Sequence, residues 1–345
     1  MFFKFLSVLV ISLSLSGLHV LDAIAAPLKV ESWQGRHLIT AERVLMGTQI
    51  IVKAIGEDKT KVEAAIAAAF DEVRRLDKLM SHYKAESELS RINQNAGVRA
   101  VPVSRELYDL IEKSIYFSEL TDGAFDISFA SVGKLWNFRK KHVPALETVK
   151  IQLPKVNYKK IRLNDRDSSV FLPEAGMEIG LGGIGKGYAM DQAMKILNAH
   201  GIKNAMVMAG GDTLIRGKKG DMPWKVGLRD PDQADGILAI LPLSDQAIST
   251  SGDYERFFFK DGKRYHHILD TKTGFPASAC RSVSILAREA TTSDALSTSV
   301  FVLGPKAGLS LIETLEGVDG IVIDREGKIH LSSGLRALDA ESVTK

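Results

Sequence analysis

The sequence is organised around one stretch, Glu178-Ile179-Gly180-Leu181-Gly182-Gly183-Ile184-Gly185-Lys186-Gly187-Tyr188-Ala189. An apolar run leads into glycines and a lysine, and a segment with helical spacing follows. Glycine-rich backbone at the start of a helix exposes N–H donors, and the helix dipole adds positive potential there. The stretch therefore predicts a turn and helix start suited to binding phosphate.

Three interpretations of this loop compete. Gly180, Gly182 and Gly185 match G-x-G-x-x-G, the dinucleotide-binding pattern, which also needs an acidic residue at the end of the next strand. That strand is expected at 204–209, but Gly210-Gly211-Asp212 follows it and is more typical of a turn. The loop also matches most of a P-loop, except that Gly187 stands where Ser or Thr should bind Mg²⁺. The third interpretation is a tight turn with no ligand.

The N-terminus has the pattern of a secretory signal peptide. Lys4 precedes an apolar run over 5–18, and Ala23-Ile24-Ala25 supplies a cleavage site. We expect cleavage after Ala25, which divides the chain into a signal peptide (1–25) and one functional domain (26–345). The apolar run is too short for a comfortable membrane span, although an uncleaved anchor is the alternative. No cysteine follows the run, so a lipoprotein anchor is not expected.

Composition narrows the function classes. The net charge is +3 with no long basic block, so nothing predicts a nucleic-acid partner. Cys280 is the single cysteine, which rules out an internal disulfide and a thiolate metal cluster. An apolar content of 45% in 345 residues is enough for one large core or two modest ones. Export makes a pyridine-nucleotide oxidoreductase a weaker candidate, because those nucleotides are mainly cytoplasmic.

The order of expected elements predicts an α+β fold. Apolar spacing indicates helices at 59–81, 104–120, 186–200, 294–303 and 306–315. Strands are expected within 43–55 and at 204–209, 224–228, 237–243, 247–249 and 282–287, and hairpins at 158–172, 257–268 and 321–331. Strict β-α-β alternation is missing, which favours largely antiparallel sheets with peripheral helices in one two-lobed unit.

Two further segments carry side chains suited to chemistry. Asp294 and Thr298 are four apart on an expected helix and therefore share a face, and their oxygens suit Mg²⁺ better than zinc. Their alternative is a helix N-terminus with Asp294 as an acid in the first turn. His266 and His267 end a strand and point to opposite faces of it, so at most one enters a given cleft. Either is a candidate general base or a structural histidine.

An ordered set of motifs runs along the chain: Met46-Gly47-Thr48, Ser81-x-Tyr83, Ser87-Glu88-Leu89-Ser90, Gly123-Ala124-Phe125-Asp126, Leu181-Gly182-Gly183-Ile184-Gly185-Lys186-Gly187-Tyr188, Gly210-Gly211-Asp212, Thr250-Ser251-Gly252-Asp253-Tyr254, His267-Ile268-Leu269-Asp270-x-x-x-Gly274 and Asp294-Ala295-Leu296-Ser297-Thr298. The set resembles the ApbE-type FAD:protein FMN transferases over nearly all of the mature chain.

The resemblance implies an activity, a compartment and a site. Such enzymes use FAD and Mg²⁺ in the periplasm, join FMN to a Thr or Ser hydroxyl of a partner protein, and release AMP. It implies His267 as the base that takes the acceptor's proton. It implies that Mg²⁺ is held by the side chains of Asp294 and Thr298 and the carbonyl of Gly183. The residues implied to contact FAD are Met46, Tyr83, Ala124, Phe125, Asp126, Gly180, Lys186 and Ile268.

One position departs from the family pattern. The family typically has Asp where this chain has Gly180, and Glu178 is the nearby acid that would compensate after a backbone shift. Three alternatives to transfer stay open at this point: hydrolysis of FAD to FMN and AMP, FAD binding without catalysis, and a secreted NAD-dependent oxidoreductase that uses a Rossmann turn at Gly180.

Overall fold

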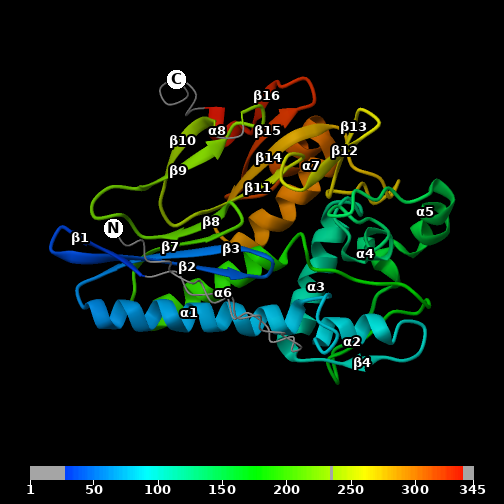
Figure 1. Cartoon of the computed structure of the whole chain (residues 1–345), viewed down its shortest axis with the longest axis horizontal. Coiled ribbons are helices and arrows are strands. Elements are labelled where there is room, and N and C mark those ends of the chain that lie inside the picture. The colour runs from blue at the N-terminus through cyan, green and yellow to red at the C-terminus, as the bar shows by residue number, and fades with distance from the viewer. Residues whose placement is uncertain (1–27, 234–235, 337–345) are drawn as a thin grey trace, which may run out of the picture.

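A nine-stranded sheet forms the centre of the molecule (Figure 1). The structure is a computed structural model that describes residues 28–233 and 236–336. In sheet order the strands are β1 (Lys29–Trp33), β2 (Arg36–Leu45), β3 (Thr48–Gly56), β7 (Asn204–Ala209), β8 (Asp212–Arg216), β11 (Ala247–Gly252), β14 (Cys280–Ala287), β15 (Asp319–Asp324) and β16 (Ile329–Leu331).

Every neighbouring pair in this sheet is antiparallel. This confirms the predicted α+β class. It also removes the Rossmann interpretation, which needs parallel strands joined by crossover helices. The strand after the glycine loop, β7, turns through Gly210 and Gly211, both with positive φ, directly into antiparallel β8. The expected turn at this point is confirmed.

Helices cover one face of the sheet and a hairpin covers the other. The long helix α1 (Lys59–Met80) and α6 (Gly185–Ala199) share a core with β2, β3 and β7. Helix α7 (Ala290–Ile312) packs on β11 and β14. On the opposite face, β9 (Trp224–Arg229) and β10 (Ile237–Leu243) bury Trp224, Val226 and Leu228 against the sheet.

A mainly helical part packs beside the sheet (Figure 1). It contains α2 (Glu88–Gln94), α3 (Arg105–Leu120), α4 (Ala130–Gly133), α5 (Leu146–Gln152) and a small sheet of β4 (Val101–Pro102), β6 (Ser169–Phe171) and β5 (Arg162–Asn164). Helix α1 joins the two parts, because its first turns lie in the sheet core and Leu76 and Met80 lie in the other core. The hairpin of β12 (Phe257–Lys260) and β13 (Lys263–His266) and the short α8 (Ser333–Arg336) complete the fold.

Helix α7 is the one helix in the described ranges that is long and apolar enough to cross a membrane. Half of its most apolar window is buried inside the molecule. The helix is interrupted at Gly304, where φ is 80°, just before Pro305. The break falls between the two helices predicted from sequence. The expected signal peptide, 1–25, lies outside the described residues.

Candidate functional site

The site is built on an ammonium group held between two buried carboxylates. Lys186 Nζ lies 2.7 Å from Asp294 Oδ1 and 2.8 Å from Asp212 Oδ2. Both aspartates are 2% exposed. Burial lowers the pKa of Lys186, but the two carboxylates outweigh it and hold the pKa above its usual range. Burial raises the pKa of Asp212 to about 6, against the opposing pull of Lys186. One negative charge in this cluster is left uncompensated when both acids are ionised.

Close contact between α6 and α7 positions Lys186 and Asp294. Gly187, the third residue of α6, donates its N–H to Asp294 Oδ2 at 2.9 Å. A Cβ on Gly187 would lie 2.2 Å from the carbonyl oxygen of Ala290, so only glycine permits this approach. Asp212 enters from the first residue of β8, where its Oδ1 accepts the N–H of Thr250. Three segments far apart in the sequence thus meet at one point.

The helix-capping alternative for Asp294 is wrong. Helix α7 begins at Ala290, so Asp294 lies one full turn inside it. The N–H groups of Ala290 and Thr291 are bound instead by the carboxylate of Asp191 from α6. The carboxylate of Asp294 instead accepts the N–H of Gly187 in the first turn of α6 and pairs with the ammonium group of Lys186.

Thr298 and Gly183 lie together beside this cluster. A Cβ built on Gly183 would be 3.2 Å from Thr298 Oγ1 and 3.1 Å from the ring of Phe125. The predicted metal donors are therefore on neighbouring segments: a carboxylate and a hydroxyl on successive turns of α7, and the backbone of Gly183. Within 28–233 and 236–336 no three His, Cys, Asp or Glu side chains gather as a zinc site requires. An all-oxygen donor set next to an uncompensated negative charge fits Mg²⁺.

His267 directly follows β13, and the structure brings it close to Lys186. Burial lowers its pKa to about 3, and the nearby charges of Arg256 and Lys186 add to the effect. Its Nδ1 atom is buried and has no hydrogen-bond partner among the residues that the structure describes. His266 points away, packs on Phe301 and binds the carbonyl of Ala277 through Nε2. The two histidines therefore have different neighbours, and the charge of Lys186 acts on His267.

Ile268 belongs to the apolar core that also contains Leu181 and Ile184 of the glycine loop, and Met46 packs against this core. Ile268 is buried, and its carbonyl accepts the N–H of Ala277. Met46 forms the turn between β2 and β3 with φ of 52°. Its Cε atom is 3.8 Å from the position of a Cβ on Gly185. A flexible thioether at this place gives an apolar wall to the start of α6.

Tyr83 and Gly180 lie at an exposed rim. Tyr83 is 84% exposed and its ring is 3.8 Å, centroid to centroid, from that of His82. His82 Nδ1 is 4.0 Å from a Cβ built on Gly180. An exposed aromatic ring is available to stack on a flat ligand. Glu178 pairs with Lys134 at 2.8 Å, so its carboxylate is already bound to another group.

Ala124, Phe125 and Asp126 are buried between the helical part and the loop. Phe125 is the one whose ring contacts Gly183. The carboxylate of Asp126 accepts hydrogen bonds from Ser128 and from the N–H of Tyr158. Asp126 thus organises its own loop and also borders a small cleft lined by Asp122, Gly123, Asn157, Lys159, Thr271 and Lys272.

The hydroxyl-rich segment of β11 faces α7. Ser249 Oγ lies 2.8 Å from Ser293 Oγ, and Ser251 Oγ lies 2.9 Å from Ser297 Oγ. These pairs fix the helix on the sheet beside Asp294. The hydroxyls of Ser249 and Ser251 thus hold α7 in register on the sheet.

Comparison with known proteins identifies the family of this chain. The model of the ApbE family matches residues 46–322. The chain therefore belongs to the ApbE family. The match starts at Met46 and extends beyond Thr298, so it includes every site residue predicted from sequence. The outermost strands of the sheet, β1 and β16, lie outside it.

Individual members of the ApbE family are similar to this chain over most of their own length. An FAD:protein FMN transferase of Treponema pallidum is 36% identical over 305 residues, covering 82% of this chain and 84% of the relative. One of Klebsiella pneumoniae is 33% identical over 297 residues, covering 85% and 91%. The crystal structure of the ApbE protein of Thermotoga maritima has a TM-score of 0.81 at 35% identity, covering 87% of this chain and 98% of that one. Flavin transferase ApbE of Vibrio cholerae has a TM-score of 0.78 at 27% identity, covering 88% and 99%.

Sequence reasoning missed two acidic residues of this site. Asp212 stood in a quoted motif but received no role, although its place after two glycines put it at a strand end. Asp191 was not singled out at all. The sequence does indicate its position, because Asp191 lies four residues after Gly187 and therefore on the same face of α6.

Proposed function

We propose that this protein transfers FMN from FAD to a Thr or Ser hydroxyl of an exported acceptor protein, with Mg²⁺, and releases AMP. The observation that carries the proposal is the buried cluster of Lys186, Asp212 and Asp294 at the start of α6, with Thr298 and Gly183 beside it. The names of the relatives supply the reaction, and the export signal expected at 1–25 supplies the compartment.

Each residue has a defined task in this proposal. The glycines at 180, 182, 183 and 185 would let the backbone approach the diphosphate of FAD without a Cβ in the way, because the side chains of Leu181 and Ile184 are buried in the core. Asp294, Thr298 and the Gly183 carbonyl would hold Mg²⁺, which neutralises charge on the diphosphate and on the departing AMP. Phosphoryl transfer depends mainly on such positioning and charge neutralisation. Lys186 keeps Asp294 oriented and is itself within reach of anionic oxygen.

His267 is the proposed general base. Because its pKa is lowered to about 3, the imidazole is neutral at physiological pH, and a neutral imidazole has one nitrogen that accepts a proton. Nδ1 is buried and unpartnered in the fold without substrate, so this role requires the site to open enough for the acceptor hydroxyl to reach the imidazole. A positioned base typically contributes roughly 10²- to 10⁴-fold in rate when its pKa lies near the working pH, so this role requires the pKa of His267 to rise well above 3 when the anionic substrate binds. Met46, Tyr83, Ala124, Phe125, Asp126 and Ile268 would line the space for the flavin nucleotide.

The test uses the mature chain with FAD, Mg²⁺ and a fraction of exported proteins that serves as the source of acceptor. AMP release is measured by chromatography, and protein-bound flavin by fluorescence in a denaturing gel. A fluorescent band that survives denaturation, with AMP released, supports transfer. Free FMN and AMP without such a band would instead show a hydrolase. Tight FAD binding with no AMP over hours would show a binding protein without catalysis.

A further inference from the structure

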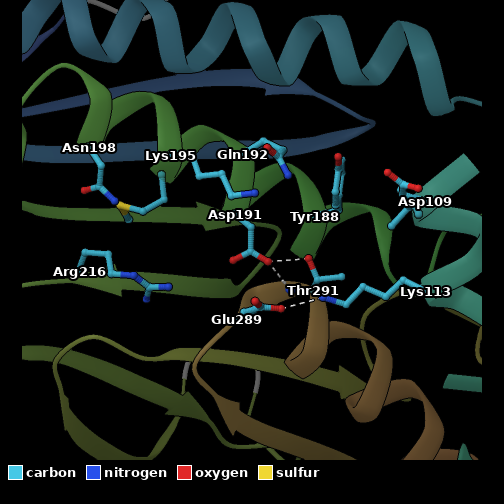
Figure 2. Close-up of a pocket in the computed structure, with 12 residues that line it drawn as sticks. Asp109, Lys113, Tyr188, Asp191, Gln192, Lys195, Asn198, Arg216, Glu289 and Thr291 are labelled. Atoms are coloured by element: carbon cyan, nitrogen blue, oxygen red, sulfur yellow. Dashed lines mark hydrogen bonds and ion pairs between the residues drawn. The ribbon is translucent and has the colours of Figure 1, made fainter. Parts of the chain in front are cut away.

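Helices α6 and α7 each bind N–H groups in the first turn of the other through an aspartate one turn further along. Asp191 of α6 accepts the N–H of Ala290 at Oδ1 (3.0 Å) and that of Thr291 at Oδ2 (2.8 Å). The hydroxyl of Thr291 adds a third bond to Oδ2 at 2.5 Å. In the other direction, Asp294 of α7 accepts the N–H of Gly187 of α6. Figure 2 shows Asp191 pointing at Thr291 across the gap between the helices.

These four positions form a closed contact. Gly187 and Asp191 are one turn apart on α6, and Ala290 and Asp294 are one turn apart on α7, so each pair faces the other. Helix α7 has no cap of its own, because Glu289 at its N-cap position makes no capping hydrogen bond. The Glu289 carboxylate instead binds Lys113 at 2.7 Å, as Figure 2 also shows.

We propose that Asp191 is a positioning residue, which fixes the rotation and height of α7 and thereby places Asp294 and Thr298 for metal binding. The proposal rests on the metal role given to those two residues above. Asp191 touches neither of them. It acts through the first turn of α7, where both of its carboxylate oxygens bind consecutive N–H groups.

Because the two carboxylate oxygens of Asp191 bind two consecutive backbone N–H groups, they oppose both sliding and rotation of α7. Sliding α7 along its axis lengthens the bonds to Ala290 and Thr291 together, and rotation lengthens one of them. A carboxylate is also favoured here because it lies at the positive end of the helix dipole. Residues behind metal ligands are known to tune a site, and their loss typically costs roughly 10- to 100-fold in metal affinity or activity.

The structure offers a matched control in the same place. Asp191 borders a cleft of about 230 Å³ between α3, α6 and α7 that also contains Asp109. Asp109 is half-exposed and pairs with Arg105 on its own helix. Because the ion-pair partner of Asp109 lies on α3, Asp109→Asn removes the same charge from the same cleft and leaves the hydrogen bonds between Asp191 and α7 intact.

The experiment compares Asp191→Asn, Thr291→Val and Asp109→Asn with the wild type in the full mature chain. We measure the Mg²⁺ concentration that gives half-maximal AMP release and, without ligands, the hydrogen exchange of the first turn of α7. Asp191→Asn is expected to raise the Mg²⁺ requirement roughly tenfold or more and to speed exchange at Ala290 and Thr291. Thr291→Val, which loses only the hydroxyl bond, should shift both readouts less and in the same direction.

Turnover of Asp191→Asn at saturating Mg²⁺ is expected to stay close to wild type, because no group at the reacting atoms is changed. An unchanged Mg²⁺ requirement in Asp191→Asn overturns the inference, and so does an equal rise in Asp109→Asn. If Asp191→Asn does not fold, Thr291→Val decides by the same criteria. A wild type without Mg²⁺-dependent AMP release contradicts the proposed function instead, and hydrogen exchange then still shows whether Asp191 holds α7.

Discussion

Replacing Gly187 with alanine is expected to break the contact that holds Asp294 against Lys186. A Cβ at this position would lie 2.2 Å from the carbonyl oxygen of Ala290 and 2.8 Å from Cβ of Asp294. Ordinary contact begins near 3.4 Å, so the helices must separate by about 1 Å. The bond from the Gly187 N–H to Asp294, now 2.9 Å, then becomes too long to count as a hydrogen bond.

The size of the effect follows from two losses. Overpacking a close contact costs about 1–3 kcal/mol, and a hydrogen bond to a charged group contributes about 1.5–3 kcal/mol. We therefore expect a loss of about 3 kcal/mol or more, which lowers Tm by roughly 4 °C or more, because an unfolding entropy of about 2.1 cal/mol/K per residue makes 1 kcal/mol equivalent to about 1.5 °C in a chain of this length. Helix propensity alone predicts the opposite sign, since alanine is favoured over glycine inside a helix by about 1 kcal/mol.

Thermal unfolding followed by circular dichroism measures the stability, and AMP release measures the site. The matched control is Gly182→Ala, because a Cβ on Gly182 has no atom within 4 Å and its Tm should stay at the wild-type value. A Gly187→Ala protein with an unchanged or higher Tm and full Mg²⁺-dependent turnover would refute the view that close approach of α6 and α7 builds the site.

Two further substitutions test the charged cluster, and a third tests His267. Asp294→Ala is expected to abolish Mg²⁺-dependent AMP release while the protein stays folded, because Lys186 keeps Asp212 as its partner at 2.8 Å; full turnover in this variant contradicts the metal assignment. Lys186→Met leaves two carboxylates buried without their cation, so we expect a loss of about 3–5 kcal/mol in thermal unfolding, partly recovered as pH falls and one acid takes up a proton. A loss that does not depend on pH argues against this cause. His267→Gln is expected to slow transfer more than it weakens FAD binding, and an equal loss of both makes His267 a binding residue. The pKa of His267 is about 3 in the fold and near 6.5 unfolded, so the stability it contributes is present above pH 6.5 and is lost as pH falls toward 3. The free energy of unfolding of the wild type minus that of His267→Gln should therefore fall as pH is lowered from 6.5 toward 3.

Local patterns predicted most elements of this fold. The hairpin at Asp261-Gly262, the helix that begins at Gly185 and the break before Pro305 all follow from residues adjacent in sequence. The start of α7 did not, because its cap is supplied by Asp191 about 100 residues earlier. Strand order was beyond reach for the same reason. The pairing of β11 with both β8 and β14 depends on contacts that no local window contains.

The candidate site divides in the same way. The resemblance to a family indicated Asp294, Thr298 and Lys186, and the structure brings them together. Asp212 lay in one of the motifs, but the sequence assigned it no role. Its role comes from an ion pair with Lys186, which lies 26 residues earlier in the sequence. This pairing is apparent only in the folded structure, where Lys186 of α6 meets the first residue of β8.

The charge count of the cluster explains why such a site would need a metal. Two buried carboxylates and one ammonium leave a net negative charge at the place proposed for the diphosphate of FAD, and like charges in a poorly solvated place repel strongly. The amides at the start of α6 attract phosphate, but Asp294 already binds one of them, the N–H of Gly187. A divalent cation bound by Asp294, Thr298 and the Gly183 carbonyl would change the sign of the local charge. The same aspartates that repel free FAD would thus make its binding depend on Mg²⁺.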